Sequence, residues 1–421
     1  MSLTATPNGD RVQIAIFGRR NAGKSSVINA VTGQQLAIVS DVKGTTTDPV
    51  YKAMEILPIG PCMFIDTPGL DDEGELGEKR VEKAVQVLNR TDIAMLVLDI
   101  SRLTPEELAQ GRGIGEKEQQ IQAMIEEKKL PYVIVLNQED KLSQEEAEKR
   151  RQQIVAKNGT VPVCNVSTVR KTGLEKLKDA LIMLAPDTDL KLHILGDLVE
   201  KNDVVVLVVP VDSAAPKGRL IMPQQQVIRD ILDNHAVSVV TQVPSLAMTL
   251  DMLGDKVKMV ITDSQAFGEV SRIVSTQIPL TSFSILFARH KGNLRTLVEG
   301  VTAVDRLRDG DRVLIAEGCT HRRQCDDIGT VKIPRWLKEY TGKKLQIETC
   351  SGTGFPTDLS SYALIIHCGG CTLHEKEMKH RIFRAQQCQV PIVNYGIFIA
   401  YVKGILKRSV ELFPAVWELL E

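Results

Sequence analysis

The segment that most constrains the fold is RVQIAIFGRRNAGKSS, residues 11–26, which joins an apolar run to a glycine-bearing turn and a helix start. Residues 18–25 fit G-x-x-x-x-G-K-S in the strand–turn–helix context that a phosphate-binding loop requires. Backbone N–H groups of such a loop and the positive end of the following helix can surround phosphates. We expect Lys24 to reach the β and γ phosphates and the Ser25 hydroxyl to bind magnesium. The nucleotide-binding residues predicted in this segment are Gly18, Asn21, Gly23, Lys24, Ser25 and Ser26.

A second segment, FIDTPGL at residues 64–70, predicts the remainder of the hydrolytic machinery. It places Asp66 at the end of a strand, where a carboxylate can hold a magnesium-bound water. The N–H group of Gly69 is then expected to face the γ phosphate.

A third segment, VIVLNQED at residues 133–140, predicts the base. It reads as a buried strand that ends in Asn137 and Asp140, and it resembles the N-K-x-D guanine motif. The Asp140 carboxylate can accept from N1 and the exocyclic amine of guanine, a donor pair that adenine does not offer. Gln138 replaces the usual lysine, and Ser167 is expected beside the base. The sequence therefore favours GTP over ATP.

Together these segments resemble the translation-factor-like GTPases related to tRNA-modifying and ribosome-assembly enzymes. The resemblance makes KGTTTDP, residues 43–49, the first switch, with Thr46 as the magnesium ligand and Thr45 or Thr47 as alternatives. The residues to which it assigns GTP hydrolysis are Lys24, Thr46, Asp66 and Gly69.

Two positions bear on the rate of hydrolysis. Asn21 matches the asparagine that helps potassium-dependent relatives hold K⁺, and its alternative interpretation is an ordinary turn residue. Leu70 occupies the position where other GTPases carry a water-orienting glutamine, so we expect slow unaided hydrolysis to GDP and phosphate.

Length and composition limit what else the chain can do. A chain of 421 residues predicts two to three domains, and we place them at 1–186, 187–272 and 273–421. A net charge of −1 argues against general binding to nucleic acid or anionic membrane. We expect a cytoplasmic protein, because no apolar signal core or membrane-length run is present. Its eight cysteines are then thiols, some of them metal ligands, rather than a disulfide framework.

The middle of the chain predicts a small parallel α/β unit without chemistry of its own. Short β-branched runs at 203–211, 236–242 and 257–263 are separated by helical stretches, and no nucleophile or ligand set accompanies them. Such a domain is expected to mediate self-association as a homodimer or a higher homo-oligomer, or docking.

The last third predicts a third parallel sheet, whose strands run into Cys319, Cys350, Cys368 and Asn394. Carboxyl ends of parallel strands meet at one edge, where α/β folds bind ligands. Cys319, Cys368 and Cys371 would then form a three-thiolate face. Three thiolates with a replaceable fourth ligand suit a 4Fe-4S cluster, and zinc would also accept three cysteines and a histidine. The overall fold class is thus α/β, with a P-loop GTPase domain and two parallel α/β domains.

The pattern C-x-H (Cys319, His321) followed by H-C-x-x-C (His367, Cys368, Cys371), behind a GTPase and a middle domain, resembles the maturation GTPases of FeFe hydrogenases. The resemblance runs over essentially the whole chain, although the intervening 322–366 is short for the family. It implies that the three cysteines hold a 4Fe-4S cluster.

The same resemblance implies a scaffold and carrier for the two-iron precursor of the hydrogenase active site, working with two radical-SAM enzymes and the hydrogenase apoprotein. His321 or His367 would be the fourth cluster ligand or a nearby group, and Cys350 is a rival. The alternative function is a potassium-dependent GTPase that acts in RNA modification or ribosome assembly through a zinc module. Against it, no basic and aromatic stripe accompanies the cysteines.

Overall fold

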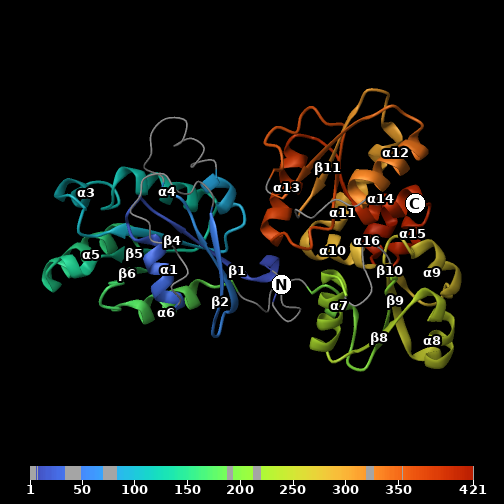
Figure 1. Cartoon of the computed structure of the whole chain (residues 1–421), viewed down its shortest axis with the longest axis horizontal. Helices are drawn as coiled ribbons and strands as arrows, with labels where there is room; N and C mark the ends of the chain where they lie inside the picture. Colours follow the sequence, from blue (N-terminus) through green and yellow to red (C-terminus); the bar gives the residue numbers. More distant parts are fainter. Residues whose placement is uncertain are drawn as a thin grey trace. The chain divides into compact units, whose positions relative to one another are not determined.

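The computed structural model describes residues 6, 8–33, 49–69, 83–186, 193–211, 220–318, 327–352 and 354–420. The chain divides into two compact units, Met1–Leu190 and Lys191–Glu421 (Figure 1). Each unit is described by itself. No helix among the described residues combines the length and the apolar character that a membrane crossing demands.

The first unit contains a six-stranded sheet in the order β2-β3-β1-β4-β5-β6. β2 runs antiparallel to β3, and the other neighbouring strands pair in parallel. β1, β4 and β5 are almost entirely buried, as expected for apolar strands covered on both faces. The strands are β1 (Val12–Phe17), β2 (Val50–Ile56), β3 (Gly60–Asp66), β4 (Ile93–Asp99), β5 (Tyr132–Asn137) and β6 (Val163–Asn165).

Helices cover both faces of this sheet. On one face α1 (Lys24–Thr32) and α6 (Leu174–Leu184) pack against Ile14 and Ile16 of β1. The opposite face, which carries Ala15 and Phe17 of the same strand, is covered by helical residues 83–88 and by further helices. These are α3 (Pro105–Ala109), α4 (Glu116–Glu127) and α5 (Gln144–Asn158). The predicted P-loop α/β architecture is confirmed, and it gathers the ends of β1, β3, β4 and β5 at one edge.

The second unit begins with a four-stranded parallel sheet in the order β10-β9-β7-β8. The predicted parallel middle sheet is therefore confirmed, but its fourth strand, β10, is absent from the prediction. β10 has only three residues, too few to show a periodic pattern. The elements are β7 (Val204–Val208), α7 (Met222–Asp233), β8 (Val237–Thr241), α8 (Leu246–Leu253), β9 (Val257–Thr262), α9 (Phe267–Ile273) and β10 (Leu280–Ser282).

The remainder of this unit forms a second four-stranded parallel sheet, as the sequence predicts, and its strand order is β12-β11-β13-β14. Its strands are β11 (Arg312–Glu317), β12 (Gln346–Ser351), β13 (Leu364–His367) and β14 (Ile392–Asn394). Its helices are α10 (Phe283–Lys291), α11 (Leu294–Val301), α12 (Ile333–Thr341), α13 (Glu375–Gln387), α14 (Tyr395–Val402), α15 (Leu406–Ser409) and α16 (Pro414–Trp417).

A single hydrophobic core joins these two sheets. Val205 and Leu207 of the first sheet belong to the same buried cluster as Val313 and Ile315 of the second. Ile285 of α10 is part of that cluster as well. The two sheets therefore pack into one hydrophobic core. The predicted domain boundaries at 186/187 and 272/273 stay a prediction.

Candidate nucleotide and cluster sites

The phosphate loop between β1 and α1 is shaped by two glycines. Gly18 has φ 150°, and a Cβ there would lie 2.2 Å from the carbonyl oxygen of Val97 on β4. Gly23 has φ 86°, and a Cβ there would lie 2.2 Å from Nδ2 of Asn137. Both glycines occupy backbone conformations that side chains disfavour, and both allow close approach of neighbouring strands. The G-x-x-x-x-G spacing therefore has a direct steric cause.

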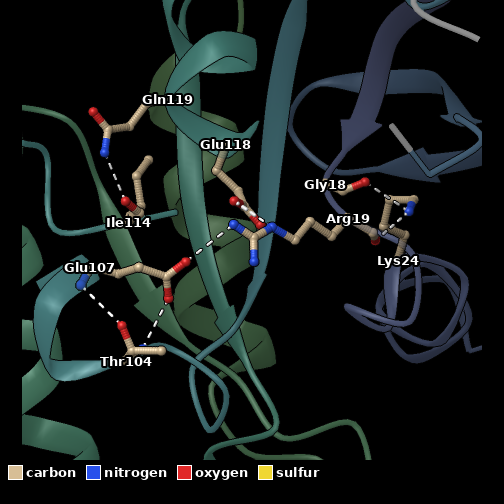
Figure 2. A network of polar contacts seen from close by, with 8 residues as sticks. All are labelled: Gly18, Arg19, Lys24, Thr104, Glu107, Ile114, Glu118 and Gln119. Carbon is tan, nitrogen blue, oxygen red and sulfur yellow. Dashed lines mark hydrogen bonds and ion pairs between the residues drawn. The ribbon is translucent and has the colours of Figure 1, made fainter. Parts of the chain in front are cut away.

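Lys24 is buried and its ammonium is held by the loop itself. Nζ donates to the carbonyl oxygens of Gly18, at 3.0 Å, and Arg19, at 2.8 Å (Figure 2). The charge is thus fixed at the turn to which the motif assigns the phosphates.

The two described residues of the predicted magnesium site lie together. Ser25 Oγ donates to Asp66 Oδ2 at 2.5 Å, across 41 residues of sequence. Burial raises the pKa of Asp66, and the Ser25 hydrogen bond and the Lys24 and Lys52 charges oppose that rise. A hydroxyl and a carboxylate at one point are the oxygen donors that Mg²⁺ prefers, so these residues fit the ion. Thr46 lies outside the described residues.

Lys52 of β2 is a neighbour of this site that the sequence did not reveal. Its side chain is buried, and Nζ donates to Asn29 Oδ1 at 2.8 Å. Burial lowers the pKa of Lys52, whereas the Asp66 charge raises it. Gly69 follows Asp66 by three residues, and Thr67 between them donates from Oγ1 to the Ile16 carbonyl at 2.5 Å. The D-T-P-G turn is therefore tied to β1.

Two residues of the predicted guanine motif donate hydrogen bonds to the phosphate loop. Asn137 is buried, and its Nδ2 donates to the carbonyl oxygen of Ala22 at 3.0 Å. The next residue, Gln138, donates from Nε2 to the carbonyl oxygen of Asn21 at 3.1 Å. The glutamine that replaces the usual lysine thus makes a direct contact with the loop. Asn21 itself is exposed with φ 60°, and its role toward K⁺ stays a prediction.

The residues predicted to read the base lie in contact. The hydroxyl of Ser167 donates to Asp140 Oδ1 at 2.6 Å and accepts from the backbone N–H of Arg170 at 3.0 Å. Arg170 Nη2 also donates to the Asp140 carbonyl at 3.3 Å. These bonds orient the carboxylate, as an acceptor for two guanine donors must be oriented. Arg170 was not predicted from the sequence, because the partner of its side chain, Asp140, lies in another motif.

In the second unit, the ends of β11 and β13 meet at Cys368. Ala316 pairs with His367 in register, and the Gly318 N–H donates to Cys368 Sγ at 3.0 Å. The Gly370 N–H approaches the same sulfur at 3.4 Å. Cys319 and His321 lie outside the described residues, but Cys319 directly follows Gly318.

His367 has both ring nitrogens engaged. Arg381 Nη1 lies 3.1 Å from Nε2, and Nδ1 lies 2.8 Å from the carbonyl oxygen of Cys368. Since arginine can only donate, Nε2 accepts and Nδ1 donates, which is a neutral imidazole. Burial, followed by the Arg381 charge, lowers the pKa of His367 to about 3. In this arrangement the ring supports the Cys368 backbone, and its role as a cluster ligand stays a prediction.

Arg381 and Lys291 are two buried cations beside the C-G-G-C turn, and the sequence prediction included neither. Arg381 of α13 also donates from Nη2 to the Gly352 carbonyl at 2.7 Å and from Nε to Glu377 Oε1 at 2.8 Å. Lys291, the last residue of α10, donates from Nζ to the carbonyl oxygens of Cys371 at 3.1 Å and Leu373 at 3.2 Å. Lys291 thus anchors the turn directly, and Arg381 supports it through His367.

Among the described residues, no three or more histidine, cysteine, aspartate or glutamate side chains gather as a metal site. Because Cys319 and His321 lie outside that part of the chain, the predicted three-thiolate set stays a prediction. Two cysteines in one turn, with N–H groups directed at the Cys368 sulfur, fit an iron-sulfur ligand loop. Cys350 packs against the core instead, and burial raises the pKa of its thiol.

Three family models match the chain. The hydrogen maturase F dimerization domain matches residues 194–292, and the hydrogen maturase F tetramerization domain matches residues 295–412. The model described as 50S ribosome-binding GTPase matches residues 13–138.

Curated relatives match the GTPase part. GTPase Der of Kosmotoga olearia is 30% identical over 220 residues, which cover 50% of this chain and 46% of Der. GTPase Era of Heliobacterium modesticaldum is 35% identical over 178 residues, 41% of this chain and 55% of Era. The tRNA modification GTPase MnmE of Alkaliphilus metalliredigens is 34% identical over 169 residues, 40% of this chain and 33% of MnmE. The chain thus spans about half the length of the first two relatives. From the family models, which cover both units, the chain belongs to the HydF hydrogenase maturase family and has an amino-terminal GTPase domain.

Proposed function

We propose that the chain is a GTP-hydrolysing scaffold that holds a 4Fe-4S cluster and assembles and delivers the two-iron subcluster precursor to FeFe hydrogenase. The observation that carries the cluster proposal is the bond from the Gly318 N–H to Cys368 Sγ. It brings the residue before Cys319 to the C-G-G-C turn, so that Cys319, Cys368 and Cys371 can meet at one strand edge.

In the GTPase domain, Lys24 binds the β and γ phosphates, and the Gly69 N–H supports the γ phosphate. Ser25 and Asp66, with Thr46, hold Mg²⁺, which neutralises charge that develops on the phosphate oxygens. Asp140 selects guanine, and Asn21 contributes to a K⁺ site. These roles rest on the contacts of Lys24, Ser25, Asp66 and Asp140 described above.

In the cluster domain, Cys319, Cys368 and Cys371 are the three thiolate ligands, which leaves one iron of a cubane open to a fourth ligand. His321 is that ligand or lies beside it. His367 belongs to the same site, and its contact with the Cys368 carbonyl supports the ligand loop. The two-iron fragment is cargo, and an exchangeable corner suits its transfer.

The proposed partners are two radical-SAM maturation enzymes, the hydrogenase apoprotein and further copies of this chain. Self-association is supported by the dimerization and tetramerization models that match residues 194–292 and 295–412. We place these encounters in the cytoplasm, where thiol ligands stay reduced.

Iron and sulfide reconstitution of the anaerobic full-length protein tests the proposal. We expect about four irons per chain and broad absorption near roughly 400 nm in the wild type. Cys319→Ser, Cys368→Ser or Cys371→Ser should each lower the iron content, whereas Cys388→Ser, at the end of α13, should not. A colourless protein that retains zinc would instead favour the RNA-linked GTPase.

A further inference from the structure

We propose that Arg19 is a positioning residue, whose side chain ties the phosphate loop to α3 and α4 and thereby sets the place of the Lys24 ammonium. The inference rests on the proposed binding of GTP. It concerns a residue that the P-loop pattern leaves unspecified, because position 19 is one of its four variable positions.

The Arg19 side chain points away from Lys24 and reaches the carboxylates of Glu107 and Glu118 (Figure 2). Its Nε lies 2.8 Å from Oε2 of Glu118, in the first turn of α4. Its Nη2 donates to Oε1 of Glu107, in the first turn of α3, at 3.2 Å. One guanidinium therefore joins the loop to two helices.

Both carboxylates are themselves held in place. The second oxygen of Glu107 accepts from the backbone N–H of Thr104 at 2.9 Å, while the Thr104 hydroxyl accepts from the Glu107 N–H at 3.2 Å. This reciprocal pair is a capping box at the start of α3. The Glu118 side chain is only 4% exposed, so its charge depends on a close cation.

The start of α4 leaves room for the guanidinium. Gly115 is the residue before α4, and a Cβ there would lie 1.9 Å from Arg19 Nη2. A side chain at position 115 would displace the arginine. The absence of a side chain at Gly115 therefore allows the Arg19 guanidinium to reach the start of α4.

The other end of Arg19 bears on the phosphate site. Its carbonyl oxygen accepts from Lys24 Nζ at 2.8 Å, next to the Gly18 carbonyl at 3.0 Å. The same residue therefore holds α3 and α4 with its side chain and the essential lysine with its backbone. Releasing the side chain frees the peptide that orients Lys24.

The geometry also separates Arg19 from a catalytic arginine. A catalytic arginine directs its guanidinium at the phosphates and stabilises the transition state. Arg19 instead directs its guanidinium at Glu118 and Glu107. Its loss should therefore weaken nucleotide binding more than it slows the chemical step.

Titration of the full-length protein with fluorescent GTP and GDP analogues, in the presence of Mg²⁺, measures the Kd for each nucleotide. We expect Arg19→Met and Glu118→Leu each to weaken the Kd by about tenfold or more, through faster dissociation. The kcat at saturating GTP should fall by a smaller factor than the Kd weakens. The control Arg102→Met removes an exposed arginine paired with Asp99 in the same unit and should change neither value.

The double variant Arg19→Met/Glu118→Leu separates positioning from folding. Arg19→Met alone leaves a buried carboxylate unpaired, and the double variant removes that charge and should recover the melting temperature. We expect its Kd to stay as weak as that of Glu118→Leu, because both lack the same tether. A Kd restored along with stability, or a kcat loss of about 100-fold at unchanged Kd, would overturn the proposal. A wild type that binds no GTP would refute the proposed function instead.

Discussion

The backbone nitrogen of Gly318 lies 3.0 Å from Sγ of Cys368, although 50 residues separate them in sequence. The contact exists because β11 and β13 are parallel neighbours that end at the same edge. An N–H group directed at sulfur stabilises the thiolate that a metal requires. This pair therefore makes the edge of the second sheet the place where the cluster proposal can be tested.

The buried Lys291 should hold the C-G-G-C turn in shape. We expect Lys291→Met to free the Cys371 and Leu373 carbonyls, which accept its hydrogen bonds. The reconstituted variant should lose iron to a chelator about tenfold faster than the wild type. Hydrogen exchange of the apoprotein should accelerate at residues 371–374.

Lys379→Met is the matched control for this change. Lys379 is a half-exposed lysine of α13 that pairs with Glu375. Equal iron loss and equal hydrogen exchange in the two variants would mean that Lys291 does not support the turn.

Arg381 should contribute more stability than a surface arginine. Its side chain is 1% exposed and pairs with Glu377, so Arg381→Met should lower the free energy of unfolding by about 3 kcal/mol. Arg312→Met breaks an exposed pair with Glu348 and should cost much less, because solvent screens exposed ion pairs. Urea denaturation followed by circular dichroism measures both losses, and similar values would contradict the assigned burial.

Asp140 should determine the base. In Asp140→Asn one acceptor becomes a donor, which clashes with the N–H groups of guanine but matches the C2 carbonyl of xanthine. GTP affinity should fall by about 100-fold or more, and xanthosine triphosphate should bind more tightly than GTP. Ser167→Ala keeps the carboxylate and should weaken GTP binding less. Calorimetric titration with GTP and xanthosine triphosphate measures the change in base preference. A variant that still prefers GTP would refute the role of Asp140 in base selection.

The Cys62 thiol should make the free energy of unfolding of the first unit decrease as the pH rises above 9. Burial is the main reason that the pKa of this thiol is raised from 9.0 to about 11. Between these values the unfolded chain loses the proton first, so stability is intact below pH 9 and falls as the pH rises toward 11. The slope is at most about 1.4 kcal/mol per pH unit.

Cys62→Ala should remove that part of the slope. Urea melts of wild type and variant at several values of pH compare the two slopes directly. Parallel curves would mean that the Cys62 thiol titrates alike in the folded and unfolded chain.

Sequence reasoning predicted the parallel sheets well because apolar runs identify buried strands and parallel strands must end together. The same logic brought Ser25 to Asp66 and Ser167 to Asp140, since motif residues follow strands of known order. The β2–β3 hairpin lay outside the prediction because β2 exposes Val50 and Tyr51 and buries Lys52, the reverse of the polarity expected of a half-buried strand.

Three cationic side chains near the two sites could not be predicted from the sequence, for a different reason. Lys291 and Arg381 look like surface residues in a sequence, because a buried charge is recognised only from its partners. Arg19 is 38% exposed, and only its contact with the buried Glu118 reveals its role. The orientation of the His367 ring depends on Arg381 in the same way. A histidine beside a cysteine suggests a ligand until the donor on its other side is known.

Helix α10 begins directly after β10 of the first sheet of this unit and ends at Lys291, whose ammonium holds the Cys371 carbonyl. Nine residues of helix span only about 13 Å, and a packed helix of that length moves as a rigid rod. Any displacement of β10 would therefore be carried along α10 to the C-G-G-C turn.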